Sequence, residues 1–232
     1  LSIRRQRQMC IRDSVFTMDK ILLGDVFIRG GSSSGTHVLE EGRPIGQFYG
    51  LVCNGIDENG RYIMVDKDGD GEISDPADYD YIGSAQPKLT YGITNTFRYK
   101  NFDLSFFLRG TIGNDILNAT RMAYAQSGFL PGTNALDDPL TYTLSETPRF
   151  SNYYLEKGSF MRLDNLTLGY KIKALNGIRV YFTAQNLFVI TKYKGLDPEV
   201  PMDSGDGLTP GVEPREFYPK ARTFSVGLNL NF

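Results

Sequence analysis

The sequence predicts an all-β fold, namely a segment of an antiparallel transmembrane β-barrel with long extracellular loops. Two observations support this prediction. Apolar and polar residues alternate over stretches of about eleven residues, which is the length of a tilted strand that crosses a bilayer. In addition, short and long connections alternate along the chain, as the periplasmic turns and extracellular loops of outer-membrane barrels do.

The first long hairpin is predicted at 89–99 and 102–112, with its turn at Lys100 and Asn101. One face of both stretches carries mainly Leu, Ile, Phe and Tyr, and the other carries mainly Thr, Ser, Gly and Arg. Alternation of this kind places every second side chain on the same side of a sheet. The two stretches should therefore pair as antiparallel strands.

A second hairpin is predicted from 166–173 and 178–190, joined by a turn at 174–177. The alternation changes phase near Asp164, which indicates a bulge. The last eleven residues, "RTFSVGLNLNF", alternate without an error and predict a final strand. Two weaker strands are also expected, at Ile45–Leu51 and Arg61–Val65.

The connections 113–159 and 191–221 are much longer than the roughly 12–15 residues at which a loop without secondary structure becomes unusual. If the short turns are periplasmic, both long connections lie outside the cell. The alternative is a soluble β-sandwich, whose strands also alternate. Its solvent face would carry Lys and Glu, whereas the polar faces here carry Thr, Ser, Gly, Asn and scattered Arg, a mixture that suits a water-filled lumen.

Composition excludes several other classes of protein. The 232 residues include 25 basic and 27 acidic residues, and a formal net charge of −2 provides no field that would attract nucleic acid. No stretch approaches the roughly 18 consecutive apolar residues of a transmembrane helix. Cys10 and Cys53 indicate neither a zinc site nor a disulfide framework. Residues 1–14 lack alternation, and we expect a non-native or disordered lead before a barrel segment at 15–232.

Five stretches carry a resemblance to a known family. They are "GRPIGQFYGLVCNGIDENGRYI", "DKDGDGEISDPADYDYIGSAQPKLTYGITNTFRYKNFDLSFFLRG", "SFMRLDNLTLGYKI", "AQNLFVITKYKGLDPEV" and "YPKARTFSVGLNLNF". In this order and spacing, over 43–232, they resemble the C-terminal part of SusC/RagA-type TonB-linked outer-membrane transporters (TonB-dependent receptors) of Bacteroidota. No single stretch decides the resemblance, but the order of all five is specific.

The resemblance implies a 22-stranded barrel, of which this chain would form about the last third, and an N-terminal plug outside this sequence. It implies a place in the cell outer membrane of a Gram-negative bacterium, in contact with outer-membrane lipid. It also implies import of oligosaccharides or peptides, energised by the TonB complex through the N-terminal part and assisted by a SusD-like surface lipoprotein. The terminal Phe232 would be read by the barrel-assembly machinery; without the resemblance, it only completes an apolar stripe.

The stretch 66–83, "DKDGDGEISDPADYDYIG", contains seven acidic residues and a single lysine. Its first half fits the calcium-binding loop of an EF-hand, but the acid expected at the twelfth position comes one residue late. A structural Ca²⁺ is therefore expected within 66–78, with a solvated acidic turn as the alternative. The residues that would supply oxygen atoms to the metal are Asp66, Asp68, Asp70, Glu72 (through its backbone carbonyl) and Asp78.

The pattern "GSSSG" at 31–35 matches the nucleophile motif of some hydrolases. No helix is predicted after the serine, and the only histidine, His37, lies too close in sequence to act as the base of such a site. We therefore expect a flexible glycine-serine loop there and no enzymatic activity. Two hypotheses remain, an importer and, from another class, a soluble β-rich extracellular binding or adhesion module with a calcium-stiffened loop.

Aromatic residues in the long connections could stack on sugars or contact a partner protein. The alternative is that they pack the loops or lie at the membrane interface. The sequence does not identify the substrate. The candidates for substrate or partner contact are Tyr142, Tyr153, Tyr154 and Tyr193.

Overall fold

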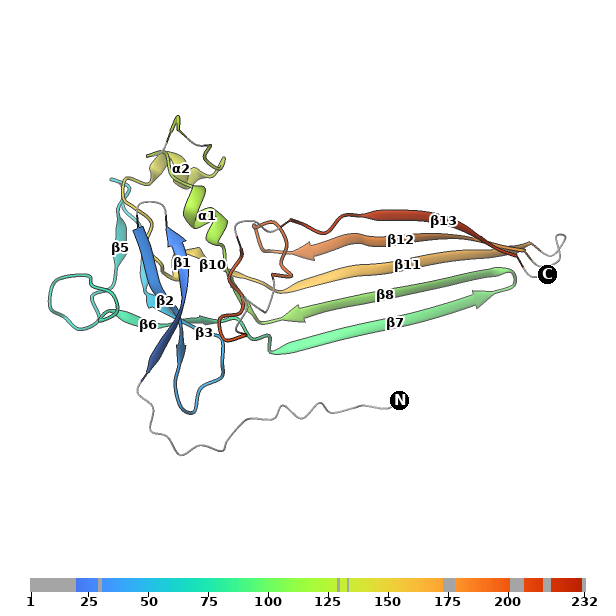
Figure 1. Ribbon diagram of the computed structural model, residues 1–232, viewed down its shortest axis with the longest axis horizontal. Helices are drawn as coiled ribbons and strands as arrows, with labels where there is room; N and C mark the ends of the chain where they lie inside the picture. The colour runs from blue at the N-terminus through green and yellow to red at the C-terminus, as the bar shows by residue number, and fades with distance from the viewer. Residues whose placement is uncertain are drawn as a thin grey trace.

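The computed structural model describes most of the chain. Its described ranges are 20–28, 31–128, 130–132, 134–172, 178–200, 207–214 and 218–230. Within them, the strands form one long five-stranded sheet and a compact part of shorter elements (Figure 1). No helix in these ranges is long and apolar enough to cross a membrane. The predicted lead at 1–14 and the terminal Phe232 lie outside the described residues.

The five long strands form an antiparallel sheet in the order β13, β12, β11, β8, β7. The first predicted hairpin is confirmed as β7 and β8, and Lys100 adopts a positive φ of 54° in the tight turn between them. The second predicted hairpin is confirmed as β11 and β12, whose predicted turn at 174–177 lies outside the described residues. The bounds are β7 Leu89–Tyr99, β8 Phe102–Ile112, β11 Phe160–Ile172, β12 Ile178–Thr191 and β13 Thr223–Asn229.

The apolar side chains of this sheet lie on one face and are exposed. Phe97 of β7 is 52% exposed, and Val226 and Leu228 of β13 are 75% and 63% exposed. The apolar stripe runs across the strands, since the register pairs Leu168 with Phe182 and Phe182 with Val226. Full burial of such a side chain stabilises a protein by roughly 1.5–3 kcal/mol relative to exposure to water. An exposed apolar face of this extent needs an apolar environment.

The opposite face is polar and holds an ion pair that crosses three strands. Arg179 of β12 donates to Asp103 of β8 through Nε at 2.9 Å and through Nη2 at 2.5 Å. The two side chains meet over Gly169 of β11, where an added Cβ would lie 2.5 Å from Arg179 Nη2 and from Asp103 Oδ1. A larger residue at Gly169 would therefore push the pair apart.

The predicted bulge near Asp164 is confirmed. The register of β11 against both of its neighbours shifts between Leu163 and Asn165. On β12, Asn186 has a φ of 51°, a conformation that Asn tolerates better than most residues. The irregularity lies at the end of the sheet where the long connections begin, next to the candidate site described below.

The compact part is built on an antiparallel sheet in the order β1, β2, β3, β6, beside the small β4–β5 hairpin. Phe48, Leu51 and Tyr79 are fully buried in it. The prediction of a flexible loop at 31–35 is wrong, because these residues begin β2 and pair with β1. The two weaker predicted strands are confirmed as β3 and β5. The bounds are β1 Ile21–Ile28, β2 Gly31–Leu39, β3 Gln47–Leu51, β4 Cys53–Ile56, β5 Tyr62–Met64 and β6 Tyr79–Ser84.

The long connection 113–159 is built of short elements rather than one structureless loop. Asn118 caps the first helix by accepting a hydrogen bond from the N–H of Arg121, and Asp138 caps the second by accepting from the N–H of Leu140. Strands β9 and β10 pair with each other. The elements are β9 Asp115–Leu117, α1 Ala119–Tyr124, α2 Pro139–Thr143, η1 Asn152–Tyr154 and β10 Leu155–Lys157.

Candidate functional site

Three carboxylates of the predicted calcium loop converge between β5 and β6. Oxygen atoms of Asp66, Asp68 and Asp78 all lie within 4.8 Å of one another. Of the other two predicted ligands, the carboxylate of Asp70 does not belong to this group, and Glu72 is expected to contribute its backbone carbonyl rather than its side chain. The carboxylate of Asp70 instead accepts a hydrogen bond from the N–H of Glu72 at 2.8 Å.

Backbone N–H groups hold these carboxylates in place. Asp78 is 1% exposed and accepts hydrogen bonds from the N–H of Lys67 at 2.6 Å and from that of Ser74 at 2.8 Å. These bonds, the one from Ser74 first, lower the pKa of Asp78. Asp66 accepts in the same way from the N–H of Gly69 at 2.6 Å. The turn is therefore organised by its own backbone.

Asp68 experiences the charges of its neighbours. The N–H of Asp70 favours the ionised form of Asp68, but desolvation and the negative charges of Asp70, Asp78 and Asp66 outweigh it and raise the pKa of Asp68. A cation between the carboxylates would relieve this repulsion. Hard cations such as Ca²⁺ prefer carboxylate and carbonyl oxygens, so the donor set fits Ca²⁺ if backbone or water oxygens complete its shell.

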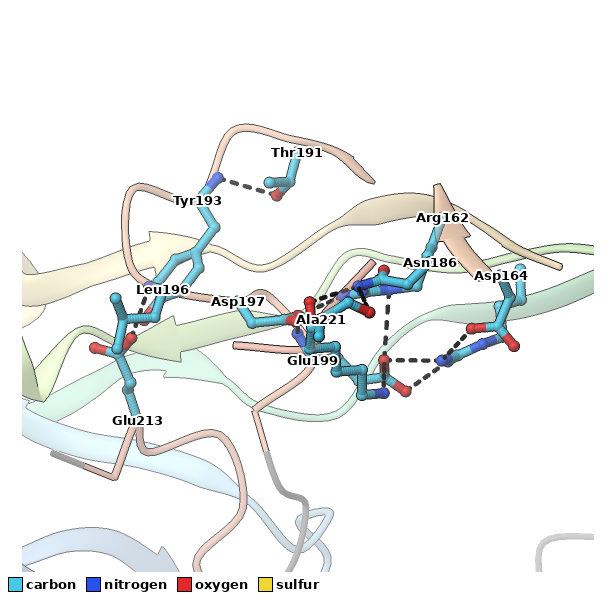
Figure 2. A network of polar contacts seen from close by, with 12 residues as sticks. Arg162, Asp164, Asn186, Thr191, Tyr193, Leu196, Asp197, Glu199, Glu213 and Ala221 are labelled. Atoms are coloured by element: carbon cyan, nitrogen blue, oxygen red, sulfur yellow. Dashed lines mark hydrogen bonds and ion pairs between the residues drawn. The ribbon is translucent and has the colours of Figure 1, made fainter. Parts of the chain in front are cut away.

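A second cluster of charged residues lies where β11 and β12 meet the loops (Figure 2). Arg162 of β11 is 1% exposed and Asp197 is 5% exposed. Arg162 Nη2 donates to Asp197 Oδ1 at 2.5 Å, and Nη1 donates to the side-chain oxygen of Asn186. Arg162 Nε lies 3.6 Å from Glu199 Oε2. The Arg162–Asp197 ion pair is thus shielded from water.

Glu199 links Arg162 to two further cations. Arg109 of β8 donates to both carboxylate oxygens of Glu199, at 2.5 and 2.9 Å, and Lys220 donates to Oε2 at 2.5 Å. Burial disfavours the ionised form of Glu199, but the hydrogen bonds from Arg109 and Lys220 outweigh it and lower its pKa. Arg109 also donates to Asp164 at the bulge, at 3.1 Å. The planar fork of a guanidinium suits such two-oxygen contacts.

This network ties the connection after β12 to the long sheet. Arg109 and Arg162 belong to the sheet, whereas Asp197, Glu199 and Lys220 belong to the connection between β12 and β13. Reasoning from the sequence missed the network. The available signal was the presence of charged residues inside the otherwise regular stretches "SFMRLDNLTLGYKI" and "AQNLFVITKYKGLDPEV", but alternation alone does not say which charges pair.

The four candidate tyrosines differ in exposure. Tyr142 on α2 is 75% exposed, and Tyr153 is partly buried. Tyr154 is fully buried, and its hydroxyl is 2.5 Å from that of Tyr62 in a shared hydrogen bond. Tyr193 is 6% exposed. The structure therefore favours a packing role for Tyr154 and Tyr193 over the predicted ligand contact, and leaves surface for a ligand or partner at Tyr142 and Tyr153.

No family model matches the chain. Among curated proteins, the chain is 34% identical to TonB-dependent receptor P3 of Formosa agariphila over 85% of this chain. It is 36% identical to TonB-dependent receptor SusC of Bacteroides thetaiotaomicron over 90% of this chain. The matches cover 23% and 21% of these two relatives, so the chain spans less than a quarter of their length.

Among solved structures, the RagAB peptide transporter matches with a TM-score of 0.68 and 25% identity, over 92% of this chain and 25% of that one. The names of these relatives are those of receptors and transporters and not of enzymes. The fold is that of a TonB-dependent transporter barrel, and the five-stranded sheet is a segment of its wall. By sequence and fold, the chain belongs to the SusC/RagA-type TonB-dependent receptors.

Proposed function

We propose that this chain is part of the wall of an outer-membrane barrel that imports nutrients in a TonB-dependent manner. The exposed apolar face of the five-stranded sheet carries the proposal. Its four longest strands have 11 to 14 residues, enough to cross a bilayer when tilted. A soluble binding module, the other hypothesis, would have to cover this face with a second layer, and the described residues supply none.

The polar face of the five-stranded sheet supports the same proposal, because polar side chains can stay hydrated when they line the lumen of a barrel. The Arg179–Asp103 pair is partly exposed on that face, where it can remain hydrated. At the loop end of the sheet, the network around Arg162 holds a long connection against the wall. A sheet with lipid on one side and a polar lumen on the other accounts for both faces.

The finer proposal concerns substrate and partners. We infer import of oligosaccharides or peptides with a SusD-like surface lipoprotein and with energy from the TonB complex through parts of the protein outside this chain. The name of the RagAB peptide transporter supports peptides, and the resemblance to SusC-type proteins supports oligosaccharides. Uptake of a fluorescent peptide and of a fluorescent oligosaccharide, with and without this gene and an adjacent lipoprotein gene, separates the alternatives.

The membrane orientation is tested by labelling cysteines on intact cells. Tyr142→Cys lies on an exposed helix of the long connection 113–159 and should react with a membrane-impermeant maleimide. Lys100→Cys lies in the tight β7–β8 turn and should react only after the outer membrane is opened. Equal labelling of both positions on intact cells, or a protein that is soluble without detergent, would contradict the proposal.

We also propose that the acidic loop holds a structural Ca²⁺ ion through Asp66, Asp68 and Asp78. The convergence of their oxygens and the raised pKa of Asp68 support this proposal. Ca²⁺ should protect the 66–78 loop from proteolysis, and EDTA should remove the protection. Asp66→Asn should lose the effect, whereas Asp137→Asn, in another loop, should retain it. Cleavage that is equal with Ca²⁺ and with EDTA would leave the solvated acidic turn as the correct interpretation.

A further inference from the structure

The polar face of the long sheet carries a row of hydroxyl side chains, one on each of its five strands. The register aligns the members of this row, which are Thr96 of β7, Ser105 of β8, Thr167 of β11, Thr183 of β12 and Ser225 of β13. Side chains of residues that lie directly opposite on neighbouring strands project from the same face of a sheet. The hydroxyls therefore form one line across the strands that lie side by side in Figure 1.

The neighbouring row toward the long loops is also uncharged. It consists of Thr94, Phe107, Asn165, Gln185 and Thr223. The two rows together form a neutral band. Charged rows bound it on both sides, since Arg109 and Arg162 lie in the next row toward the loops, and Arg98 and Asp103 lie in the next row toward the tight turn. The middle of the polar face thus differs in chemistry from both of its ends.

The hydroxyls of the neutral band are accessible and only partly paired. Thr96 and Ser225 are exposed, and Ser105, Thr167 and Thr183 are partly exposed. Thr167 and Thr183 share a hydrogen bond of 3.2 Å between their Oγ1 atoms. The hydroxyls of Thr96, Ser105 and Ser225 make no hydrogen bond with the residues that the structure describes. These three hydroxyls can therefore exchange water for another hydrogen-bonding group at little cost.

The side chains of the neutral band match the chemistry of a sugar. The hydroxyls of a sugar both donate and accept hydrogen bonds, as do those of Ser and Thr. The amides of Asn165 and Gln185 add further donors and acceptors, and the partly exposed ring of Phe107 offers an apolar surface to the C–H groups of a sugar. A charged terminus of a peptide would find no oppositely charged side chain within the two rows. The composition of the band therefore favours an uncharged ligand that is rich in hydroxyls.

Permanent packing of another polypeptide segment fits the neutral band less well. Such a contact would have to pair the three unpaired hydroxyls, because a buried polar group without a partner is unfavourable. Stable protein interfaces are also centred on large apolar and aromatic side chains. Phe107 is the one side chain of this kind in the two rows. A ligand that binds weakly and leaves again suits the band better than a fixed protein contact.

We propose that the neutral band is a contact surface for an uncharged oligosaccharide that passes along the barrel wall, which rests on the import function proposed above. Neighbouring strands lie about 4.8 Å apart, so the row of hydroxyls extends for about 19 Å. Because the strands of a barrel are tilted, a row at right angles to them climbs obliquely along the wall. Passage requires contacts that are strong enough for entry and weak enough for release, and a series of similar hydroxyls provides such contacts.

The test measures the labelling of introduced cysteines in the intact protein that carries this chain, purified in detergent. Thr96→Cys and Ser225→Cys place a thiol in the row, and Thr90→Cys places one on the same face of β7 outside the band. The background carries Cys10→Ser, and the thiol of Cys53 is buried. The probes are uncharged hexasaccharides of glucose, mannose and xylose, and a Gly-Ser hexapeptide with free termini.

We expect at least one hexasaccharide, at several times its Kd, to slow labelling of both row positions at least about fivefold. Labelling of Thr90→Cys should be unchanged, and the hexapeptide should protect neither row position. Absence of protection by every hexasaccharide, equal protection by the hexapeptide, or equal protection of Thr90→Cys would overturn the proposal. Row thiols that the reagent cannot reach without ligand would also overturn it, because a polypeptide segment would then cover the band.

A second comparison separates the hydroxyl group from the shape of the side chain. Thr96→Val removes the hydroxyl at nearly constant volume and should weaken the protection of Ser225→Cys about two- to tenfold, as for loss of one hydrogen bond. Thr96→Ser keeps the hydroxyl and should retain the protection, and Thr90→Val is the matched control outside the band. Equal protection in Thr96→Val and the wild type would refute the role of the row. Protection reports binding and uptake by cells reports import, so a hexasaccharide that protects but is not imported would contradict the proposed function and not the contact surface.

Discussion

Replacing Arg162 by methionine removes a guanidinium group while keeping an unbranched apolar stem in its place. Asp197 is 5% exposed and would keep the N–H of Glu199, at 2.9 Å, as a donor. Its charge would lose the Arg162 partner that lies at 2.5 Å. Removing one member of a buried ion pair costs roughly 3–5 kcal/mol, because the other charge stays buried. We expect a loss of this size in the local stability of the connection between β12 and β13.

Hydrogen exchange of backbone amides measures this local stability. The N–H of Glu199 donates to Asp197 of the network, and the N–H of Leu196, next to Asp197 in the sequence, donates to Glu213 within the same connection, so their protection reports whether the connection stays docked. At 1.4 kcal/mol per factor of ten, the expected loss corresponds to roughly two to three and a half orders of magnitude in protection. Amides in the centre of β8 and β11 should retain their protection, because the barrel wall itself is unchanged.

Lys220→Met is the matched control for this experiment. Lys220 binds the same Glu199 carboxylate, but its side chain is 42% exposed, and exposed ion pairs contribute about 0–1 kcal/mol. Its loss should change protection by less than about one order of magnitude. If the two variants have the same effect, or if Arg162→Met leaves the protection of Leu196 and Glu199 unchanged, the buried pair does not hold the connection in place.

Three further predictions concern other parts of the chain. Gly169→Ala should lower the free energy of unfolding, measured in urea, by about 1–3 kcal/mol, because the added Cβ would collide with the Arg179–Asp103 pair. Gly128→Ala, which has open space around it, should leave the free energy of unfolding unchanged. The pKa of Asp78 is lower in the folded chain, so its ionised form stabilises the acidic loop above the ordinary Asp pKa near 3.9. This stabilisation is lost as the pH falls below the ordinary Asp pKa and through the lowered pKa of the folded state. Protection of the Lys67 and Ser74 amides from hydrogen exchange should therefore weaken between about pH 4 and 2 but not between about pH 5 and 8. Tyr62→Phe should cost roughly 1–3 kcal/mol in urea unfolding by leaving the Tyr154 hydroxyl buried without a partner, and an unchanged midpoint would contradict this.

The long strands could be predicted from the sequence because each is a local pattern. Alternation over about eleven residues has few competing interpretations, and the change of phase near Asp164 located the bulge to within a residue. The compact part shows only two weaker patterns, which correspond to β3 and β5. The composition of the serine-rich stretch at 31–35 predicts a loop, yet the stretch pairs with β1 as a strand. Tertiary pairing can override a weak local preference, and composition does not reveal that pairing.

Of the candidate sites, the one formed by a single short stretch could be predicted from the sequence, and the one formed by distant residues could not. The acidic loop could be located because the spacing of its carboxylates lies within one short stretch, and the convergence of Asp66, Asp68 and Asp78 agrees with that spacing. The network around Arg162 joins distant residues: Asn186 and Asp197 are 24 and 35 positions from Arg162, and Arg109 is 90 positions from Glu199. Arg162 also lies beside the register shift between Leu163 and Asn165.

The exposure of an aromatic residue in the long connections also depends on residues that are distant in the sequence. Tyr153 and Tyr154 are adjacent in the sequence, yet Tyr154 is fully buried against Tyr62 while Tyr153 retains exposed surface. Nothing within their own stretch distinguishes the two. Tyr62, about ninety residues upstream, packs edge-on against both rings, and its hydroxyl shares a hydrogen bond with that of Tyr154. A loop aromatic in a barrel of this family therefore becomes a candidate for ligand contact only after the packing of the loops around it is known. By that criterion Tyr142 is the residue of the four to test first.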